Sequence, residues 1–279
     1  MIKIVTDSTA YLSETTVRQH DIRVVPLYVH FGNEAFKEGV DITDEEFYAR
    51  LKAAPELPTT SQPSAGEFHE VFKELADAGH EILTLTISSK LSGTWNSAMA
   101  AKKMLPDADI SVIDSLSTSV GLELMVNAAI HAVAAGKKLE EITAQIEEIR
   151  EKMWLLFVVD TLEYLAKGGR IGNARALLGT VLKVKPILSL QDGAIEPMEQ
   201  VRSKRKAVAR MIELVEDHLA ESCSVANVAV MNALVEGEAE ELGKELETRW
   251  TCATPLVSSL GPVIGTHTGP GVLGVAAYA

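Results

Sequence analysis

Four segments of the sequence that are expected to form loops are rich in hydrogen-bond donors. They span residues 59–64, 88–94, 164–171 and 265–271. Together they offer hydroxyl, imidazole, guanidinium and free backbone N–H groups, and none of them contains Asp or Glu. Donor groups without a neighbouring carboxylate are suited to an anionic ligand. We therefore predict an anion site assembled from these segments.

The segment 88–94 lies between an apolar strand pattern and a helix pattern. Gly93 lets the backbone approach a ligand closely, the N-terminus of the helix directs N–H groups outward, and Ser92 adds a hydroxyl. The alternative is that Ser92 or Thr94 only caps that helix. Both interpretations stay open at this point.

Two further hydroxyls, those of Thr60 and Ser61, precede a predicted helix start. Ser64 forms a capping box with Glu67, so the capping role is already taken. Thr60 and Ser61 are therefore either turn formers, which is the commoner use of such residues, or ligand donors.

His267 lies between Gly265 and Gly269, in a segment expected to be a loop. It can donate a hydrogen bond to a carboxylate or titrate near neutral pH. The alternative is an exposed loop histidine without a role.

Arg170 follows Gly168 and Gly169 at a predicted turn after a helix. A guanidinium at such a turn is suited to bidentate contact with a carboxylate or phosphate. The alternative is a solvated helix C-terminus with one of the two glycines in the left-handed conformation.

Several motifs of nucleotide, hydrolase and metal sites are absent from the sequence. There is no G-x-x-x-x-G-K-[ST], no G-x-G-x-x-G after the first strand pattern, no G-x-S-x-G and no H-E-x-x-H. Cys223 and Cys252 have no C-x-x-C spacing and fit a reduced compartment. We expect no metal and no cofactor.

The composition indicates a globular chain with an extensive core. The chain has 279 residues, 47% of them hydrophobic, and a net charge of −13. This charge argues against nucleic-acid binding and against adhesion to anionic membranes. No apolar run approaches the ~20 residues of a membrane span, and a strand pattern begins directly after Met1. We expect no membrane insertion and a cytoplasmic location.

Alternating strand and helix patterns in the first half of the sequence predict a doubly wound parallel sheet. The expected strands lie at residues 2–6, 22–31, 81–88, 110–114 and 154–159. Ligands of such sheets bind beyond the carboxyl ends of the strands, which is where segment 88–94 falls.

The second half has a different pattern. A turn at residues 191–193 joins two apolar runs into a hairpin, and a helix from Ser203, a strand at 225–231 and a helix at 237–249 follow. We predict an α/β fold in which residues 1–160 form the parallel α/β domain with the head-group loops. Residues 161–279 would form an α+β domain with a mixed or antiparallel sheet that closes the pocket.

Seven motifs, in this order and over nearly the whole chain, resemble those of the DegV family. They are Thr6-Asp7-Ser8, Thr60-Ser61-Gln62-Pro63, Leu91-Ser92-Gly93-Thr94, Val112-Ile113-Asp114-Ser115, Lys167-Gly168-Gly169-Arg170-Ile171, Lys185-Pro186-Ile187 and His267-Thr268-Gly269-Pro270-Gly271.

The resemblance implies a two-domain lipid-binding protein that encloses one long-chain fatty acid, such as palmitate or oleate, without catalysis of its own. It implies a fatty-acid-binding subunit of bacterial fatty acid kinase. Such a subunit presents the acid to the separate catalytic subunit and carries acyl phosphate to the acyltransferase of phospholipid synthesis.

By the same resemblance, Thr60 or Ser61, Ser92 with the backbone of Gly93, and His267 would hold the carboxylate. Arg170 would lie at the mouth of the pocket. At the positions of Gly172 and Asn173 some relatives carry Ser-Lys, a difference that bears on docking to the kinase.

Two hypotheses from other classes compete with the carrier. One is an acyl ester or acyl phosphate hydrolase in which Ser92 is the nucleophile, His267 the base, and Asp7 or Asp114 the orienting group. The other is a phosphotransfer domain in which His267 becomes phosphorylated.

Overall fold

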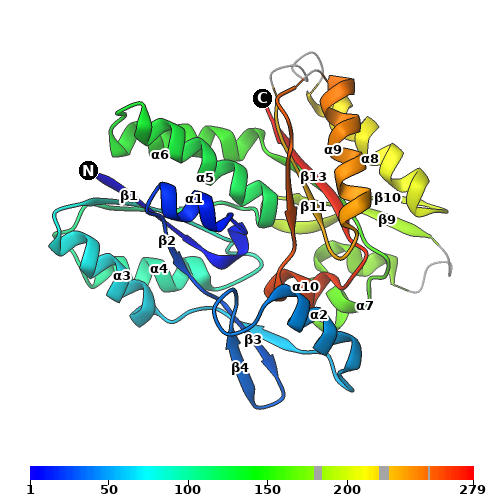
Figure 1. The fold of residues 1–279 in the computed structure, drawn as a ribbon, viewed down its shortest axis with the longest axis horizontal. Helices are drawn as coiled ribbons and strands as arrows, with labels where there is room; N and C mark the ends of the chain where they lie inside the picture. Colours follow the sequence, from blue (N-terminus) through cyan, green and yellow to red (C-terminus); the bar gives the residue numbers. More distant parts are fainter. Residues whose placement is uncertain (179–183, 220–225, 251) are drawn as a thin grey trace.

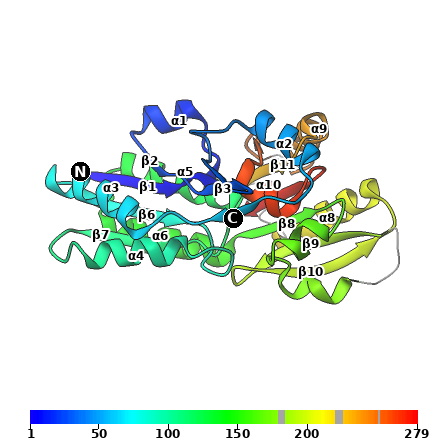
Figure 2. The same ribbon diagram turned by 90° about the horizontal axis from the view of Figure 1, so that it is seen from below.

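Two large β-sheets lie at opposite ends of an elongated molecule, and helix α10 (Pro262–Thr268) lies where the two parts meet (Figures 1 and 2). The structure, a computed structural model, describes residues 1–178, 184–219, 226–250 and 252–279. The predicted α/β class, a parallel sheet followed by a mixed sheet, is confirmed. Cys223 lies outside the described residues.

The first sheet is parallel throughout. Its strand order is β2 (Arg23–Val25), β1 (Ile2–Asp7), β6 (Glu81–Thr86) and β7 (Ile110–Asp114). Apolar residues such as Leu83 and Leu85 are fully buried here because helices cover both faces.

One face of this sheet packs against α3 (Ala65–Asp77) and α4 (Thr94–Lys103), the other against α5 (Ser119–Ala134) and α6 (Leu139–Lys152). The predicted capping box at the start of α3 is confirmed, because the Ser64 hydroxyl accepts from the Glu67 N–H and the Glu67 carboxylate accepts from the Ser64 N–H. The short helices η1 (Ser8–Ala10) and α1 (Glu14–Gln19) follow β1.

The second sheet has six strands and is antiparallel except for the pair β11–β12. Its order is β10 (Ala194–Val201), β9 (Lys185–Gln191), β8 (Trp154–Val158), β13 (Leu273–Tyr278), β11 (Asn227–Asn232) and β12 (Leu256–Ser259). The prediction that the run at 154–159 is a fifth parallel strand is wrong, since β8 pairs antiparallel with β13 and β9. The proposed division at residue 160 stays a prediction.

Helices α8 (Lys204–Leu219) and α9 (Glu236–Trp250) cover one face of the second sheet. The other face turns toward the first part of the chain and toward α7 (Glu163–Lys167), η2 (Gly172–Leu177) and α10. The predicted hairpin is confirmed, with Asp192 and Gly193 both at positive φ in the turn between β9 and β10.

A small third sheet was not expected from the sequence. Its antiparallel order is β4 (Glu34–Lys37), β3 (Tyr28–Phe31) and β5 (Thr59–Ser61), and α2 (Asp44–Ala53) lies between β4 and β5 in the chain. The single strand predicted at 22–31 is therefore wrong. It divides around Pro26, which has no N–H for a ladder, into β2 of the first sheet and β3 of this one.

Every helix in the described part of the chain is too short or too polar to cross a bilayer.

Candidate functional site

A cavity that is partly open to solvent lies between the inner face of the second sheet, α7, α10 and the loops of the first part. The space between its walls is about 750 Å³ when the solvent-filled opening is counted. Most of its lining is an apolar wall, formed by Leu27, Ile87, Leu91, Leu155, Phe157, Leu165, Leu190, Ile195, Met231, Leu260, Val263 and Ile264.

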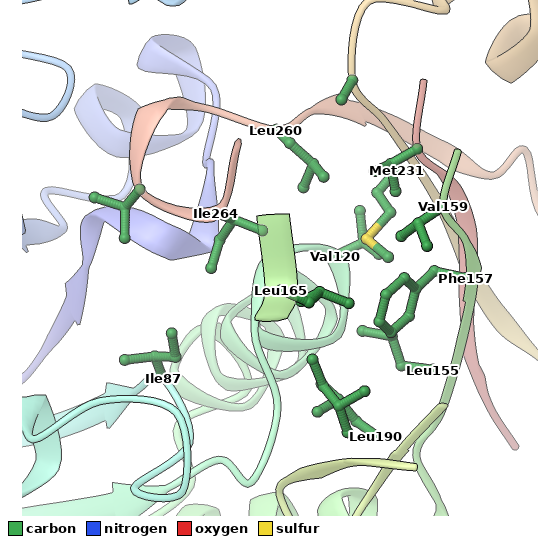
Figure 3. Packing of buried hydrophobic residues seen from close by; sticks show 14 of the residues in the cluster. Ile87, Val120, Leu155, Phe157, Val159, Leu165, Leu190, Met231, Leu260 and Ile264 are labelled. Atoms are coloured by element: carbon green, nitrogen blue, oxygen red, sulfur yellow. The ribbon is translucent and has the colours of Figure 1, made fainter. Parts of the chain in front are cut away.

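Strand alternation explains how β8 contributes to this wall. Leu155 and Phe157 point to the cavity side, whereas Leu156 and Val158 point into the core beneath α8 and α9. Figure 3 shows Leu165 of α7 between these two β8 side chains and Ile264 of α10. The wall is thus assembled from a sheet face and two short helices.

Polar groups of the cavity gather around His267. Its Nε2 lies 2.8 Å from the Thr60 hydroxyl. The Arg170 guanidinium donates from Nε to the Leu91 carbonyl (3.2 Å) and from Nη1 to the Gly168 carbonyl (2.9 Å). We call five polar residues that line the cavity the donor cluster: Thr60, Gln62, Ser92, Arg170 and His267.

His267 is neutral at pH 7. Burial and then the positive charge of Arg170 lower the pKa of His267 to about 4. Nδ1 has no hydrogen-bond partner among the residues that the structure describes, and it lies against the backbone of Gly168, where a Cβ would approach it to 2.2 Å. A proton on Nδ1 would be a buried, unpaired donor, so the arrangement favours the Nε2–H tautomer. Nε2–H then donates to Thr60, whose own O–H is left to donate to a ligand.

The expectation that His267 lies in a loop is wrong, because the residue lies in α10 and is buried. Pro262 at the start of α10 and burial against α2 and α7 offset the poor helix propensity of its glycines and threonines. The alternative of an exposed histidine is excluded.

Thr60 and Ser61 point in different directions, since successive side chains of β5 alternate. Thr60 contacts His267, whereas the Ser61 hydroxyl lies 2.8 Å from Nε2 of His30 on β3. Both residues line the cavity, but only the Thr60 hydroxyl belongs to the donor cluster.

Gly93 is the N-cap residue of α4, so neither Ser92 nor Thr94 occupies that position. The Ser92 hydroxyl accepts from the N–H of Thr94, the first residue of α4, at 3.4 Å. The Ser92 hydroxyl lies 2.8 Å from that of Thr94. Gly93 itself does not line the cavity; it lies behind Gln62, whose amide nitrogen would be 2.4 Å from a Cβ at this position.

At the turn after α7, Gly169 takes the left-handed conformation, as expected if this segment is a helix C-terminus. Arg170 is nevertheless more than a solvated helix end, because it links this turn to the loop of Ser92 and is part of the cavity lining.

None of the described residues that line the cavity is Asp or Glu. Asp7 accepts from the backbone N–H of Ile87 (2.6 Å), and Asp114 accepts from that of Ser89 (3.0 Å). Neither contacts His267, so the orienting role that the hydrolase hypothesis assigns to Asp7 or Asp114 is not supported. The Ser92 hydroxyl is paired with Thr94 rather than with His267.

Gln62, Thr118 and the whole apolar wall were not identified from the sequence. Gln62 stands within the motif of Thr60, which was the available signal. Thr118 lines the cavity, and its hydroxyl has no hydrogen-bond partner in the described part of the chain. Among the described residues, no group of three His, Cys, Asp or Glu is arranged to hold a metal ion.

The fold and the cavity define an α/β protein with two large sheets and a pocket that is apolar over most of its lining and contains a few hydrogen-bond donors. The sequence model described as "Uncharacterised protein, DegV family" matches residues 1–279. The chain therefore belongs to the DegV family. A DegV domain-containing protein of Halalkalibacterium halodurans is 38% identical over 278 residues, which are 99% of this chain and 98% of that protein.

Solved structures of other members have the same fold. A DegV family protein of Thermus thermophilus, described as fatty acid binding, superposes with a TM-score of 0.94 at 35% identity and covers 100% of this chain and 99% of its own. A stearic acid-binding protein of Eubacterium ventriosum superposes with a TM-score of 0.94 at 31% identity and covers 100% of this chain and 98% of its own.

Proposed function

We propose that this protein binds one long-chain fatty acid, with the acyl chain along the apolar wall and the carboxylate at the donor cluster. The observation that carries the proposal is the union, in one cavity, of an apolar wall with hydrogen-bond donors and, among the described residues, no carboxylate. The relatives described as binding fatty acids, stearic acid among them, support the same ligand class.

The two parts of the cavity match the two parts of such a ligand. Each buried methylene contributes ~0.8 kcal/mol, so ~14 methylenes contribute ~11 kcal/mol before the cost of association. The carboxylate loses water on binding and needs hydrogen bonds in return. Thr60, oriented by neutral His267, supplies one, and Ser92 and Gln62 are further polar residues of the same cavity.

Arg170 supplies the positive charge. Two of its five N–H donors bind the carbonyls of Leu91 and Gly168, which fixes the guanidinium next to His267 and leaves the others for a ligand. The charge stabilises a bound carboxylate, and these backbone contacts also hold it in place when no ligand is bound.

We further propose that the protein is a non-catalytic, cytoplasmic subunit that presents the fatty acid to the kinase catalytic subunit and delivers acyl phosphate to the acyltransferase. This proposal follows from the family motifs. Formation of acyl phosphate from ATP and stearate only when both purified proteins are present would support it, and ATP-dependent product from this chain alone would contradict it.

Thr60→Ala and Ser61→Ala form a matched pair that tests the ligand site. Calorimetric titration with stearate should show a loss of affinity of about tenfold or more for Thr60→Ala, because a hydrogen bond to a charged group is removed. Ser61→Ala should bind as the wild type does, since its hydroxyl faces His30. The affinities of the two variants for octadecanol, which has no carboxylate, should differ far less. Equal losses in both would contradict the assignment.

A further inference from the structure

We propose that Glu38 is a positioning residue of the fatty-acid site: it holds the N-terminus of α10 and thereby places His267 against Thr60. This role rests on the proposed function, and Glu38 itself lies outside the cavity lining. The first N–H groups of α10 are bound by side chains from distant parts of the chain.

The start of α10 has no capping side chain of its own. Its N-cap residue is Gly261, and Pro262 has no N–H. The N–H of Val263 donates to Oε1 of Glu38 at 2.7 Å, and the N–H of Ile264 donates to the hydroxyl oxygen of Tyr11 at 3.2 Å. A carboxylate at a helix N-terminus is also favoured by the helix dipole. Glu38 and Tyr11 therefore perform the capping of α10.

Glu38 is itself fixed by burial and by hydrogen bonds of its side chain and backbone. It is buried, and it follows β4 directly in the chain. Oε2 accepts from the Ser8 hydroxyl at 2.5 Å, and Oε1 accepts from the Tyr11 hydroxyl at 3.1 Å. The Glu38 N–H donates to the Leu27 carbonyl at 2.9 Å. Side chain and backbone together fix Glu38 to the segment directly after β1 and to the connection between β2 and β3.

The helix transmits this position to the donor cluster because it is short and tightly seated. A Cβ on Gly261 would lie 2.7 Å from the Tyr11 ring and 3.0 Å from Oε1 of Glu38. The Tyr48 hydroxyl donates to the Leu260 carbonyl at 2.9 Å, which fixes the chain just before the helix. His267 follows Val263 by four residues, about one turn, so a tilt at the first turn moves its ring away from Thr60.

Glu38 also brings pH dependence. Burial is the main reason that its pKa is raised to about 7, and the negative charge of Asp44 on α2 raises it further. The other titratable groups that face it are the neutral hydroxyls of Tyr11 and Tyr48. Protonation removes the charge at the N-terminus of α10, so the anchor weakens as the pH falls through that value.

The test compares Glu38→Gln with Glu123→Gln in the full chain. Glu123 is a second buried carboxylate with a pKa raised to about 7 by burial, but its side chain accepts from Ser258 on β12 instead of from an N–H of α10. Glu38→Gln should lower the affinity for stearate about fivefold at pH 8, as expected for loss of a buried charge at a helix terminus. The difference in stearate affinity between Glu38→Gln and the wild type should be smaller at about pH 6, because Glu38 of the wild type is protonated there. Glu123→Gln should show neither change.

A spectroscopic signature separates positioning from general damage. The imidazole nitrogen signals of His267, assigned with His267→Gln, should shift in Glu38→Gln and stay in place in Glu123→Gln. Tyr11→Phe removes the acceptor of the Ile264 N–H and should shift the His267 signals in the same direction. This variant replaces Glu38→Gln in the test if Glu38→Gln does not fold. Unchanged His267 signals and unchanged affinity would overturn the inference while leaving the proposed function intact. A wild type that takes up no stearate would overturn the proposed function, and the His267 signals would still decide the role of Glu38.

Discussion

The donor cluster and the apolar wall line the same cavity but are built in opposite ways. Members of the donor cluster come from separate segments, and several are fixed by an individual contact, such as that of Thr60 with His267 or of Arg170 with Leu91. The wall consists of twelve apolar side chains. We therefore expect recognition of the head group to be concentrated in few atoms and recognition of the acyl chain to be distributed and tolerant.

The largest expected effect concerns a wall residue that is also part of the core. Phe157→Ala should lower the free energy of unfolding by roughly 3–5 kcal/mol, as for other buried aromatic truncations, and should weaken stearate binding. Phe72→Ala, in the core beneath α3, should lose similar stability in denaturant titration but keep its affinity. Equal loss of stearate affinity in both would show that the wall is not specific to the ligand.

The second effect is a pH dependence that belongs to the donor cluster. Because the pKa of His267 is lowered to about 4 in the folded state, the unfolded state binds the proton first as the pH falls below about 6.5. Between pH 7 and pH 5 the ligand-free wild type should thus lose about 2 kcal/mol of stability relative to His267→Gln.

Asp7 and Glu38 act in the opposite direction, since their raised pKa values make the folded state bind protons first. The difference between wild type and His267→Gln in urea titrations cancels their contributions. Parallel stability curves for the two proteins over this pH range would contradict a buried neutral His267.

A single methyl group should disturb the donor cluster. Gly168 has an ordinary φ of −74°, but a Cβ there would lie 2.2 Å from Nδ1 of His267. Gly168→Ala should displace the ring from Thr60 and lower stearate affinity about tenfold, as for loss of one hydrogen bond to a charged group. Gly237→Ala is the control, because no atom lies within 4 Å of its Cβ. Wild-type affinity in Gly168→Ala would mean that the position of His267 does not matter.

The smallest effect should come from trimming the wall. Ile264→Val removes one methylene and should lower stearate affinity about fourfold, equivalent to ~0.8 kcal/mol. Ile113→Val, in the core between the parallel sheet and α5, should not change affinity. A loss as large as that of Gly168→Ala would show that the wall is not tolerant.

The same contrast explains what the sequence predicted. Loop chemistry is local, so Ser92, Arg170 and the capping box of Ser64 could be read from residue types and spacing. The choice between Thr60 and Ser61 could not, because it depends on which face of β5 meets α10. The burial of His267 was also missed, since a segment rich in glycine and threonine resembles a loop until tertiary contacts are known.

The wall was beyond prediction for a physical reason. Leu155 and Leu156 are adjacent, equally apolar and both buried, yet one faces the cavity and the other the core under α8. Period-two alternation defines two faces but not which face is hollow. The strand at residues 154–158 was predicted, but its antiparallel partners β9 and β13 lie later in the chain and follow no local signal.

The most direct test of the central claim is native mass spectrometry of the protein purified without added lipid, followed by extraction and fatty acid analysis. The account predicts one long-chain fatty acid per chain, and weaker retention in Thr60→Ala than in Ser61→Ala. A protein that carries no lipid and takes up no added stearate would contradict it.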